Sequence, residues 1–173
     1  MGNPTRQSTL VPAMAAHARA DVAAPRGCTN FRLRQLMRRL DQHYDAELSK
    51  AGLRTTQYSL LSHVVQLEPV RPGDLARAMK MQPSTLTRNL QPLVDAGWVL
   101  LGPGTDARSR SITATQAGHD KRLQAQRRWK AAQLGVNGLL GAARVAALHD
   151  LIDQSLELLA LHPPAPSTGD SNG

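Results

Sequence analysis

The chain has 173 residues, about the size of one ordinary domain, and is long enough to bury a hydrophobic core without disulfides or metals. Its formal net charge of +8 suggests a polyanionic partner, which can be DNA, RNA or an anionic membrane, while only 3% aromatic residues argue against stacking platforms for single-stranded nucleic acid. A single cysteine excludes an internal disulfide, and the absence of a signal-like start and of an apolar run of about 18 residues predicts a cytoplasmic protein with no membrane span.

The two ends of the chain have the composition of flexible tails. Residues 1–26 are rich in Ala, Pro and small polar residues, and residues 163–173 are rich in Pro, Ser and Gly. We therefore expect one folded domain over residues 27–162.

Two helices are predicted at the start of this domain. Apolar residues recur at three- and four-residue spacing over 29–50, with Thr29 as the expected N-cap and Gly52 ending the run. The second helix is predicted over 56–67, where Pro69 stops it. The residues expected on the apolar faces are Leu33, Leu36, Met37, Leu40, Tyr44 and Leu48 in the first helix, and Tyr58, Leu61, Val64 and Val65 in the second.

The next two predicted helices, 72–79 and 83–97, are joined only by Lys80, Met81 and Gln82, which is helix-turn-helix spacing. Each begins with a proline, where a missing N–H costs nothing. A helical wheel places Leu86, Leu90, Leu93, Val94 and Gly97 together on one side of the second helix. Ser84, Thr85, Arg88 and Gln91 fall on the opposite side, with Thr87 at the flank.

After Trp98 the pattern changes to period two over 99–101 and 111–114, which predicts a hairpin around a glycine-containing basic loop. Thr115 is expected to cap a long basic helix that reaches Leu134 and is broken by the glycines that follow. A last helix is predicted over 142–161. Because the terminal helices lack enough neighbours in one chain to cover their apolar faces, a partner subunit is predicted.

These features favour binding to double-stranded DNA. Hydroxyls near a helix start can bind phosphates or base edges, and an arginine such as Arg88 can grip guanine with two hydrogen bonds. In the loop, Asp106 can brace the backbone or Arg108, while Arg108 projects into a minor groove and Arg110 reaches a phosphate. Alone, the helix could be an ordinary solvated face and the loop a charged edge that keeps the hairpin soluble. Their adjacency favours the DNA-binding interpretation.

The arrangement resembles the MarR family of winged-helix bacterial regulators over about residues 28–162. The resemblance rests on STLTR at 84–88, DAGWV at 95–99, and DARS at 106–109 followed by Ile112 and Thr115. It implies a mainly α fold with a small β-hairpin wing, in which a winged helix-turn-helix lobe (54–114) joins a helical dimerisation region (27–53 and 115–162).

The functional expectation from this resemblance is a homodimeric transcriptional regulator, a repressor rather than an activator. Its paired recognition helices would enter successive major grooves of a pseudo-palindromic operator, with half-sites roughly 34 Å apart. Two departures from the family pattern stand out. Lys80 replaces a common glycine in the turn, where a left-handed backbone would cost roughly 1 kcal/mol, so we expect a differently built turn. Pro92 inside the recognition helix predicts a kink or local loosening.

Relatives often sense small aromatic acids between the dimer helices and the DNA-binding lobe. By position, the residues that could line such a pocket and bind an aromatic carboxylate are Arg39, His43, Tyr44, Gln57 and Tyr58. The alternative is that the tyrosines are core residues and His43 is solvated. Cys28 lies near Arg26 and Arg32 just before a helix, so a redox-sensing regulator is a second hypothesis.

Other function classes fit the sequence poorly. No Cys, His and carboxylate cluster has metal-ligand spacing, and no nucleophile elbow, phosphate-cradling glycine loop or paired catalytic carboxylates occur. We therefore expect no metal, no cofactor and no enzymatic activity. The winged-helix module of a methyltransferase would need a following nucleotide-binding domain. A winged helix used only for protein association would show no salt-sensitive binding to DNA.

Overall fold

The computed structural model describes residues 26–104 and 110–162. The helices and strands in this part are α1 (Thr29–Leu48), the 3-10 helix η1 (Ser49–Ala51), α2 (Thr55–Leu67), α3 (Pro72–Ala78), α4 (Pro83–Asp95), β1 (Val99–Pro103), β2 (Arg110–Ala114), α5 (Gln116–Leu140) and α6 (Ala142–Leu161). The predicted fold class, mainly α with a small hairpin, is confirmed. Apart from Arg26, the two predicted tails lie outside the described residues.

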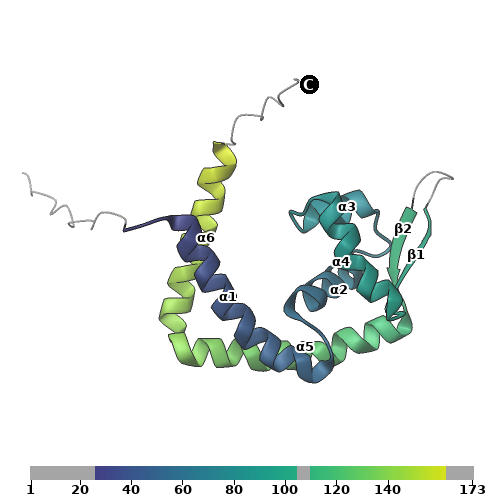
Figure 1. Cartoon of the computed structure of the whole chain (residues 1–173), viewed down its shortest axis with the longest axis horizontal. Helices are drawn as coiled ribbons and strands as arrows, with labels where there is room; N and C mark the ends of the chain where they lie inside the picture. The colour runs from purple at the N-terminus through teal and green to yellow at the C-terminus, as the bar shows by residue number, and fades with distance from the viewer. Residues whose placement is uncertain (1–25, 105–109, 163–173) are drawn as a thin grey trace, which may run out of the picture.

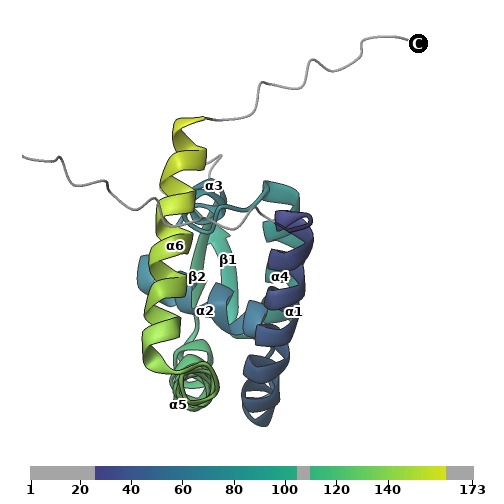
Figure 2. The same ribbon diagram turned by 90° about the vertical axis from the view of Figure 1, so that its left-hand side faces the viewer.

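The molecule has two parts, a lobe and a stalk. Figure 1 shows the lobe beside one end of the long helix α5, and α1 and α6 toward its other end. The lobe consists of α2, α3, α4, β1 and β2, and the stalk consists of α1, η1, α5 and α6. Figure 2 shows α6 rising from the end of α5, with α1 separated from it on the other side. Among the described residues no single helix is long and apolar enough to cross a membrane; only α5 and α6 as a pair, bent by 102°, reach that length and composition.

The start of α1 differs from the sequence prediction. Cys28, with an extended backbone and no side-chain cap hydrogen bond, occupies the N-cap position, so the predicted Thr29 cap is wrong. The other end agrees with the prediction, because Gly52 has a φ of 69° and ends the helical run after η1. Leu48 is fully buried, whereas Leu33 and Met37 are exposed. The apolar face of α1 is therefore covered within this chain mainly near its C-terminal end.

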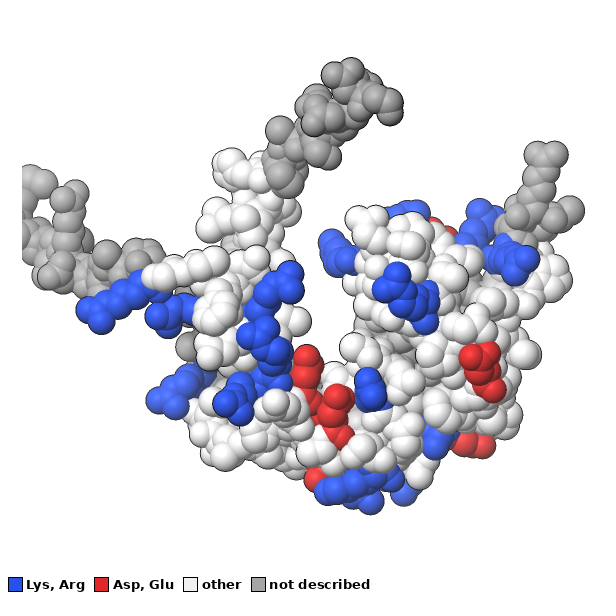
Figure 3. Space-filling model, in the orientation of Figure 1, with Lys and Arg blue, Asp and Glu red and all other residues white. Residues whose placement is uncertain are grey.

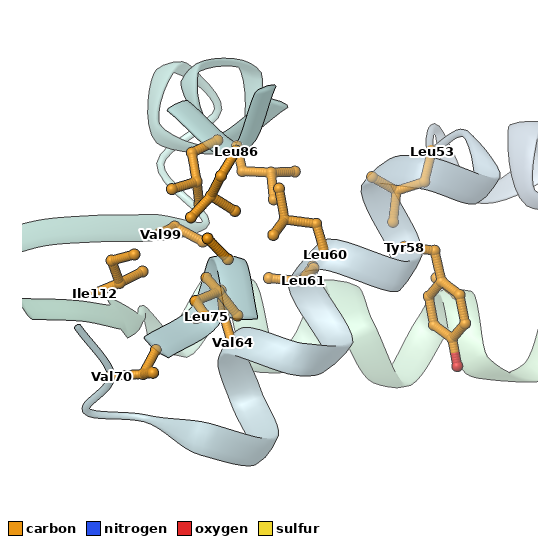
Figure 4. Close-up of a cluster of buried hydrophobic side chains, with 14 of the residues drawn as sticks. Leu53, Tyr58, Leu60, Leu61, Val64, Val70, Leu75, Leu86, Val99 and Ile112 are labelled. Carbon is orange, nitrogen blue, oxygen red and sulfur yellow. The ribbon is translucent and has the colours of Figure 1, made fainter. Parts of the chain in front are cut away.

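The lobe is built around a continuous hydrophobic core (Figure 4). The helices α3 and α4 both begin with a proline at the predicted position. Their apolar faces meet the second helix and the hairpin, so side chains from every lobe element contribute. The large fully buried side chains of the lobe are Leu60, Leu61, Val64, Leu75, Leu86, Leu93, Val99 and Ile112. Of the residues predicted for α2, Val65 is only half-buried, and Leu60 is a core residue that the prediction missed.

The hairpin pairs antiparallel from Val99 opposite Ala114 to Pro103 opposite Arg110, slightly longer than predicted. Val70 adds a bridge to Ile112, with two backbone hydrogen bonds of 3.1 and 2.8 Å. The Glu68 carboxylate accepts a hydrogen bond from the Ala114 N–H and lies 2.8 Å from His119 Nε2 on α5. These contacts thus connect the end of α2 to both the hairpin and α5.

The long helix α5 begins as predicted and ends later than predicted. The Thr115 hydroxyl caps it by accepting a hydrogen bond from the Gly118 N–H at 3.0 Å. The predicted break after Leu134 is wrong, because α5 continues to Leu140. A glycine in a helix costs only about 1 kcal/mol, which the burial of Ala132 and Val136 along the same helix can offset. Gly141, with a φ of 82°, separates α5 from α6, which has the predicted bounds.

Candidate nucleic-acid interface

The turn between α3 and α4 is short and tightly hydrogen-bonded. The Met81 N–H donates to the Ala76 carbonyl at 2.8 Å, and the Lys80 N–H donates to the Arg77 carbonyl at 3.1 Å. Lys80 has a φ of 53°, in the left-handed region that glycine usually occupies. The expectation of a differently built turn is therefore wrong: Lys80 adopts the strained conformation, at a cost of roughly 1 kcal/mol.

The helix α4 turns one face to the core and the other to solvent. Leu86, Leu90 and Leu93 are buried on the inner face. The polar residues predicted to bind DNA are all exposed on the remaining surface: Ser84, Thr85, Thr87, Arg88 and Gln91. The helix continues through Pro92 and ends at Asp95.

Two of these side chains are engaged within the helix itself. The Thr87 hydroxyl donates to the Pro83 carbonyl at 3.0 Å, and the Gln91 amide donates to Asp95 Oδ1 at 2.7 Å. Gln91 would have to exchange Asp95 for a base or phosphate to contribute to binding. The side chains of Thr87 and Gln91 are therefore already held by hydrogen bonds within α4, whereas no such bond within the helix ties Ser84, Thr85 or Arg88 in the part of the chain that the structure describes.

Beside α4 stands the hairpin, whose second strand begins with Arg110, exposed and opposite Pro103. Asp106 and Arg108, predicted for the tip of the wing, lie outside the described residues. Figure 3 shows Lys and Arg side chains over the upper part of the lobe, while the acidic side chains on this face lie mainly lower down and in the angle between lobe and stalk. The end of the lobe that carries α3, α4 and the hairpin therefore suits a polyanion.

A groove of about 390 Å³ beside α4 adds a residue that the sequence did not indicate. Arg54 at the start of α2 and Arg88 on α4 both line it, together with Thr56, Gln57, Asn89 and Pro92. Two guanidinium groups on one groove suit a phosphate, because each offers several N–H donors. Arg54 was missed because its proximity to Arg88 depends on how α2 packs against α4. The only sequence signal is a basic residue just before a helix.

A larger cavity of about 560 Å³ lies between α1, α2 and α5. Of the residues predicted for an effector pocket, Tyr44 and Tyr58 line it, whereas Arg39, His43 and Gln57 are not among the described residues of its wall. Arg39 donates to Gln42 on the exposed side of α1, and Gln57 accepts a hydrogen bond from the Arg54 N–H and lines the groove beside α4. Two of the five predicted residues, Tyr44 and Tyr58, thus line this cavity, and the ligand set itself stays a prediction.

The cavity combines aromatic walls with buried polar atoms. The rings of Tyr58 and Trp129 stack with centroids 6.2 Å apart. The Tyr44 hydroxyl donates to Gln133, and burial raises the pKa of Tyr44 above its usual value. The remaining polar or apolar residues of the wall are Met37, Leu40, Asp41, Thr55, Ser59, Ser62, His63, Arg122 and Gln126.

Two atoms in this wall are buried without a hydrogen-bond partner in the described part of the chain: Ser62 Oγ and Arg122 Nε. A terminal nitrogen of Arg122 donates to Gln126 at 3.3 Å, which leaves the rest of the guanidinium available. Sequence reasoning missed Arg122 because nothing in its spacing shows that α5 turns it toward α2.

Cys28 is exposed at the N-cap position of α1, so the redox hypothesis stays a prediction. Among residues 26–104 and 110–162, no group of three or more His, Cys, Asp or Glu residues could hold a metal ion.

Comparison with known proteins agrees with this geometry. The model of the MarR family matches residues 51–109. The transcriptional regulator MosR of M. tuberculosis, solved in complex with DNA, has 30% sequence identity and a TM-score of 0.64, over 76% of this chain and 98% of that one. A search of the curated proteins found no match.

More distant solved structures share the fold. A mutant of MarR from E. coli complexed with operator DNA has 22% identity and a TM-score of 0.67, covering 73% of this chain and 92% of that one. The repressor CouR, bound to a 23-mer DNA duplex, has 16% identity and a TM-score of 0.69, over 75% and 92% of the two chains.

Proposed function

Because this chain belongs to the MarR family of DNA-binding transcriptional regulators, we propose that it is a homodimeric repressor of the cytoplasm that acts by binding a pseudo-palindromic operator rather than by catalysis. The observation that carries the proposal is the exposed polar face of α4, held between a tight turn and a basic hairpin. Its 30% identical relative MosR was solved in complex with DNA, which supports DNA as the partner.

Each residue predicted to bind DNA has a proposed role. Ser84, Thr85, Thr87, Arg88 and Gln91 face the major groove, where hydroxyl, amide and guanidinium groups can read base edges. Arg108 enters the flanking minor groove with Asp106 as its brace, and Arg110 binds a phosphate. Arg54 adds a second phosphate contact beside Arg88, since both line one groove.

The proposed dimer is supported by apolar side chains that the single chain leaves uncovered. They lie at the same end of the molecule, on α1 and α6, and include Phe31, Leu33, Met37, Leu151, Leu156 and Leu159. Exposed apolar side chains in such number usually mark an interface. Two copies joined there would present two α4 helices to successive major grooves, roughly 34 Å apart.

Fluorescence anisotropy with duplex DNA tests the DNA-binding roles. Replacing Arg88 by Ala should cost about 1–3 kcal/mol and relax base preference, whereas Arg110→Ala should weaken all sequences similarly and lower the salt slope by about one. Arg127→Ala, an exposed position on α5, is the control for loss of charge. Unchanged affinity in both lobe variants would overturn these roles, and salt-insensitive or absent binding of the parent would favour a protein-association module.

The cavity is the proposed site of a small aromatic carboxylate that releases the protein from DNA. Its aromatic wall of Tyr58 and Trp129 suits a ring, and the guanidinium of Arg122, which lines the cavity, suits a carboxylate. Titration with benzoate and its hydroxylated derivatives should raise the melting temperature and dissociate the protein–DNA complex.

Two matched variants locate the effector site. Arg122→Met should abolish the response to benzoates, while Arg39→Met, a change of the same kind on exposed α1, should preserve it. A response that depends on Arg39 and not on Arg122 would return the site to the position that the sequence alone predicted. The absence of any thermal shift and of any release from DNA would remove the effector proposal.

A further inference from the structure

The lobe is joined to the stalk by two chain crossings, one at η1 before α2 and one at the start of α5. Lys121 connects them. From the first turns of α5 its ammonium Nζ donates a hydrogen bond to the Ala51 carbonyl at 3.1 Å, between residues 70 positions apart in sequence. Such a charge-assisted bond ties the entrance of the lobe to its exit.

The same ammonium also contacts the lobe itself. Lys121 Nζ lies 5.0 Å from the centroid of the Trp98 ring, which is cation–π distance. Trp98 lies three residues after the last residue of α4, Asp95, and its N–H donates to the Leu93 carbonyl on α4 at 2.9 Å. A cation on the stalk therefore contacts a residue that is hydrogen-bonded to the last turn of the predicted DNA-binding helix.

The backbone of Trp98 is held just as closely to α5. Its carbonyl accepts a hydrogen bond from the Thr115 N–H at 3.0 Å, and the Thr115 hydroxyl donates to Gly97 at 2.7 Å. A Cβ at Gly118 would lie 2.1 Å from the Trp98 carbonyl oxygen, so only glycine permits this approach. The end of α4, the start of α5 and η1 therefore converge on one junction, formed by Ala51, Trp98, Thr115, Gly118 and Lys121.

We propose that Lys121 is a positioning residue for DNA recognition, which fixes the angle of α4 on the stalk and thereby the separation of the two α4 helices in a dimer. The proposal rests on the DNA-binding dimer proposed above. With 13 residues, α4 is about 20 Å long, so a rotation of about 10° at the junction moves its far end by roughly 3 Å. That displacement is close to one base-pair step of the duplex, about 3.4 Å. The angle of α4 on the stalk thus determines which half-site spacing the dimer binds best.

A duplex that the parent protein binds is selected first. The test then measures affinity for a panel of duplexes derived from it, in which the two half-sites are moved apart or together by one base pair. Each step also turns one half-site by about 35° relative to the other. The parent should show a sharp optimum. Lys121→Met keeps an unbranched stem but has neither charge nor donor, so its affinity for the optimal duplex should fall by about tenfold, a part of the free energy of the two lost contacts that would now be needed to hold α4 in place on binding. Its preference among spacings should become flat or shift.

Two variants separate positioning from loss of charge or stability. Lys121→Arg should restore the sharp optimum, because it keeps a cation and several donors. Lys130→Met, an exposed lysine on the same helix, should leave the optimum sharp. If Lys121→Met does not fold, Lys121→Gln replaces it with the same expected flattening.

The outcomes distinguish this proposal from the proposed function. A parent that binds no duplex, or binds without a spacing preference, contradicts the DNA-binding dimer itself. A parent with a sharp optimum that Lys121→Met and Lys121→Gln retain, even at lower affinity, overturns only the role of Lys121.

Discussion

The lobe and α6 bury their apolar side chains in opposite ways. In the lobe, Leu61, Leu75 and Leu93 are completely buried against neighbouring elements of the same chain. In α6 only Val145 is buried, and Leu156 and Leu159 are 61% and 68% exposed. The lobe thus buries its large core side chains within one chain. The helix α6 is also rich in apolar residues, but most of its apolar side chains stay exposed. The comparison indicates that the part proposed to read DNA folds on contacts within one chain, whereas the part proposed to pair subunits would be covered only by a second copy.

The largest effect is expected from charged substitutions on α6, which should disrupt the proposed dimer. Leu156→Asp combined with Leu159→Asp would place two charges per subunit in the proposed interface, at a cost of several kcal/mol. Light scattering after gel filtration should then report a monomer in place of a dimer. Asp153→Leu, an apolar change on the same helix, is the control and should leave the dimer intact. A double variant that stays dimeric would show that α6 does not form the interface.

The lobe should respond in the converse way. Leu61→Ala removes a fully buried side chain and should lower the free energy of unfolding by about 2–5 kcal/mol in urea titrations. Leu100→Ala, at a position 57% exposed on β1, should change it by about 0.5 kcal/mol or less. Similar losses at the two sites would contradict the assignment of the core.

Between the two regions, Gly118 provides a finer test. An added methyl would meet the Trp98 carbonyl oxygen, so Gly118→Ala should destabilise the protein by about 1–3 kcal/mol. At Gly73 on α3 nothing lies within 4 Å of an added Cβ, and Gly73→Ala should be neutral or stabilising by up to about 1 kcal/mol. Thermal unfolding of both variants checks the contrast, which equal melting temperatures would refute.

The smallest expected effect concerns the cavity between lobe and stalk. Tyr44→Phe removes the hydroxyl that bonds Gln133 and should cost about 1 kcal/mol. The Tyr58 hydroxyl has no hydrogen bond recorded within the described residues, so Tyr58→Phe should be close to neutral in the same urea titration. A larger loss at Tyr58 than at Tyr44 would contradict the hydrogen-bond assignment.

Local chemistry explains what the sequence could predict. Pro72, Pro83 and Thr115 mark helix starts by rules that need only neighbouring residues, and each lies where it was expected. Failures occurred where packing decides: α5 continues through glycines while Ala132 and Val136 on its inner face are buried, and Lys80 takes a left-handed backbone because the turn requires it.

The candidate sites divide in the same way. The polar face of α4 follows from helical periodicity, so its exposed residues could be named in advance. Arg54 and Arg122 could not, because each acquires its neighbours from a different helix. Periodicity tells which face of a helix is polar but not which other helix that face meets.

The account depends on two α4 helices spaced to enter successive major grooves, and a distance measurement between them tests this most directly. In a Cys28→Ser background, which removes the single native cysteine, Ser84→Cys carries a spin label in the exposed first turn of α4. Pulsed electron paramagnetic resonance should give one main distance between the two labels of about 34 Å, one turn of the duplex. No dipolar coupling, or a main distance far from one helical turn, would contradict the account.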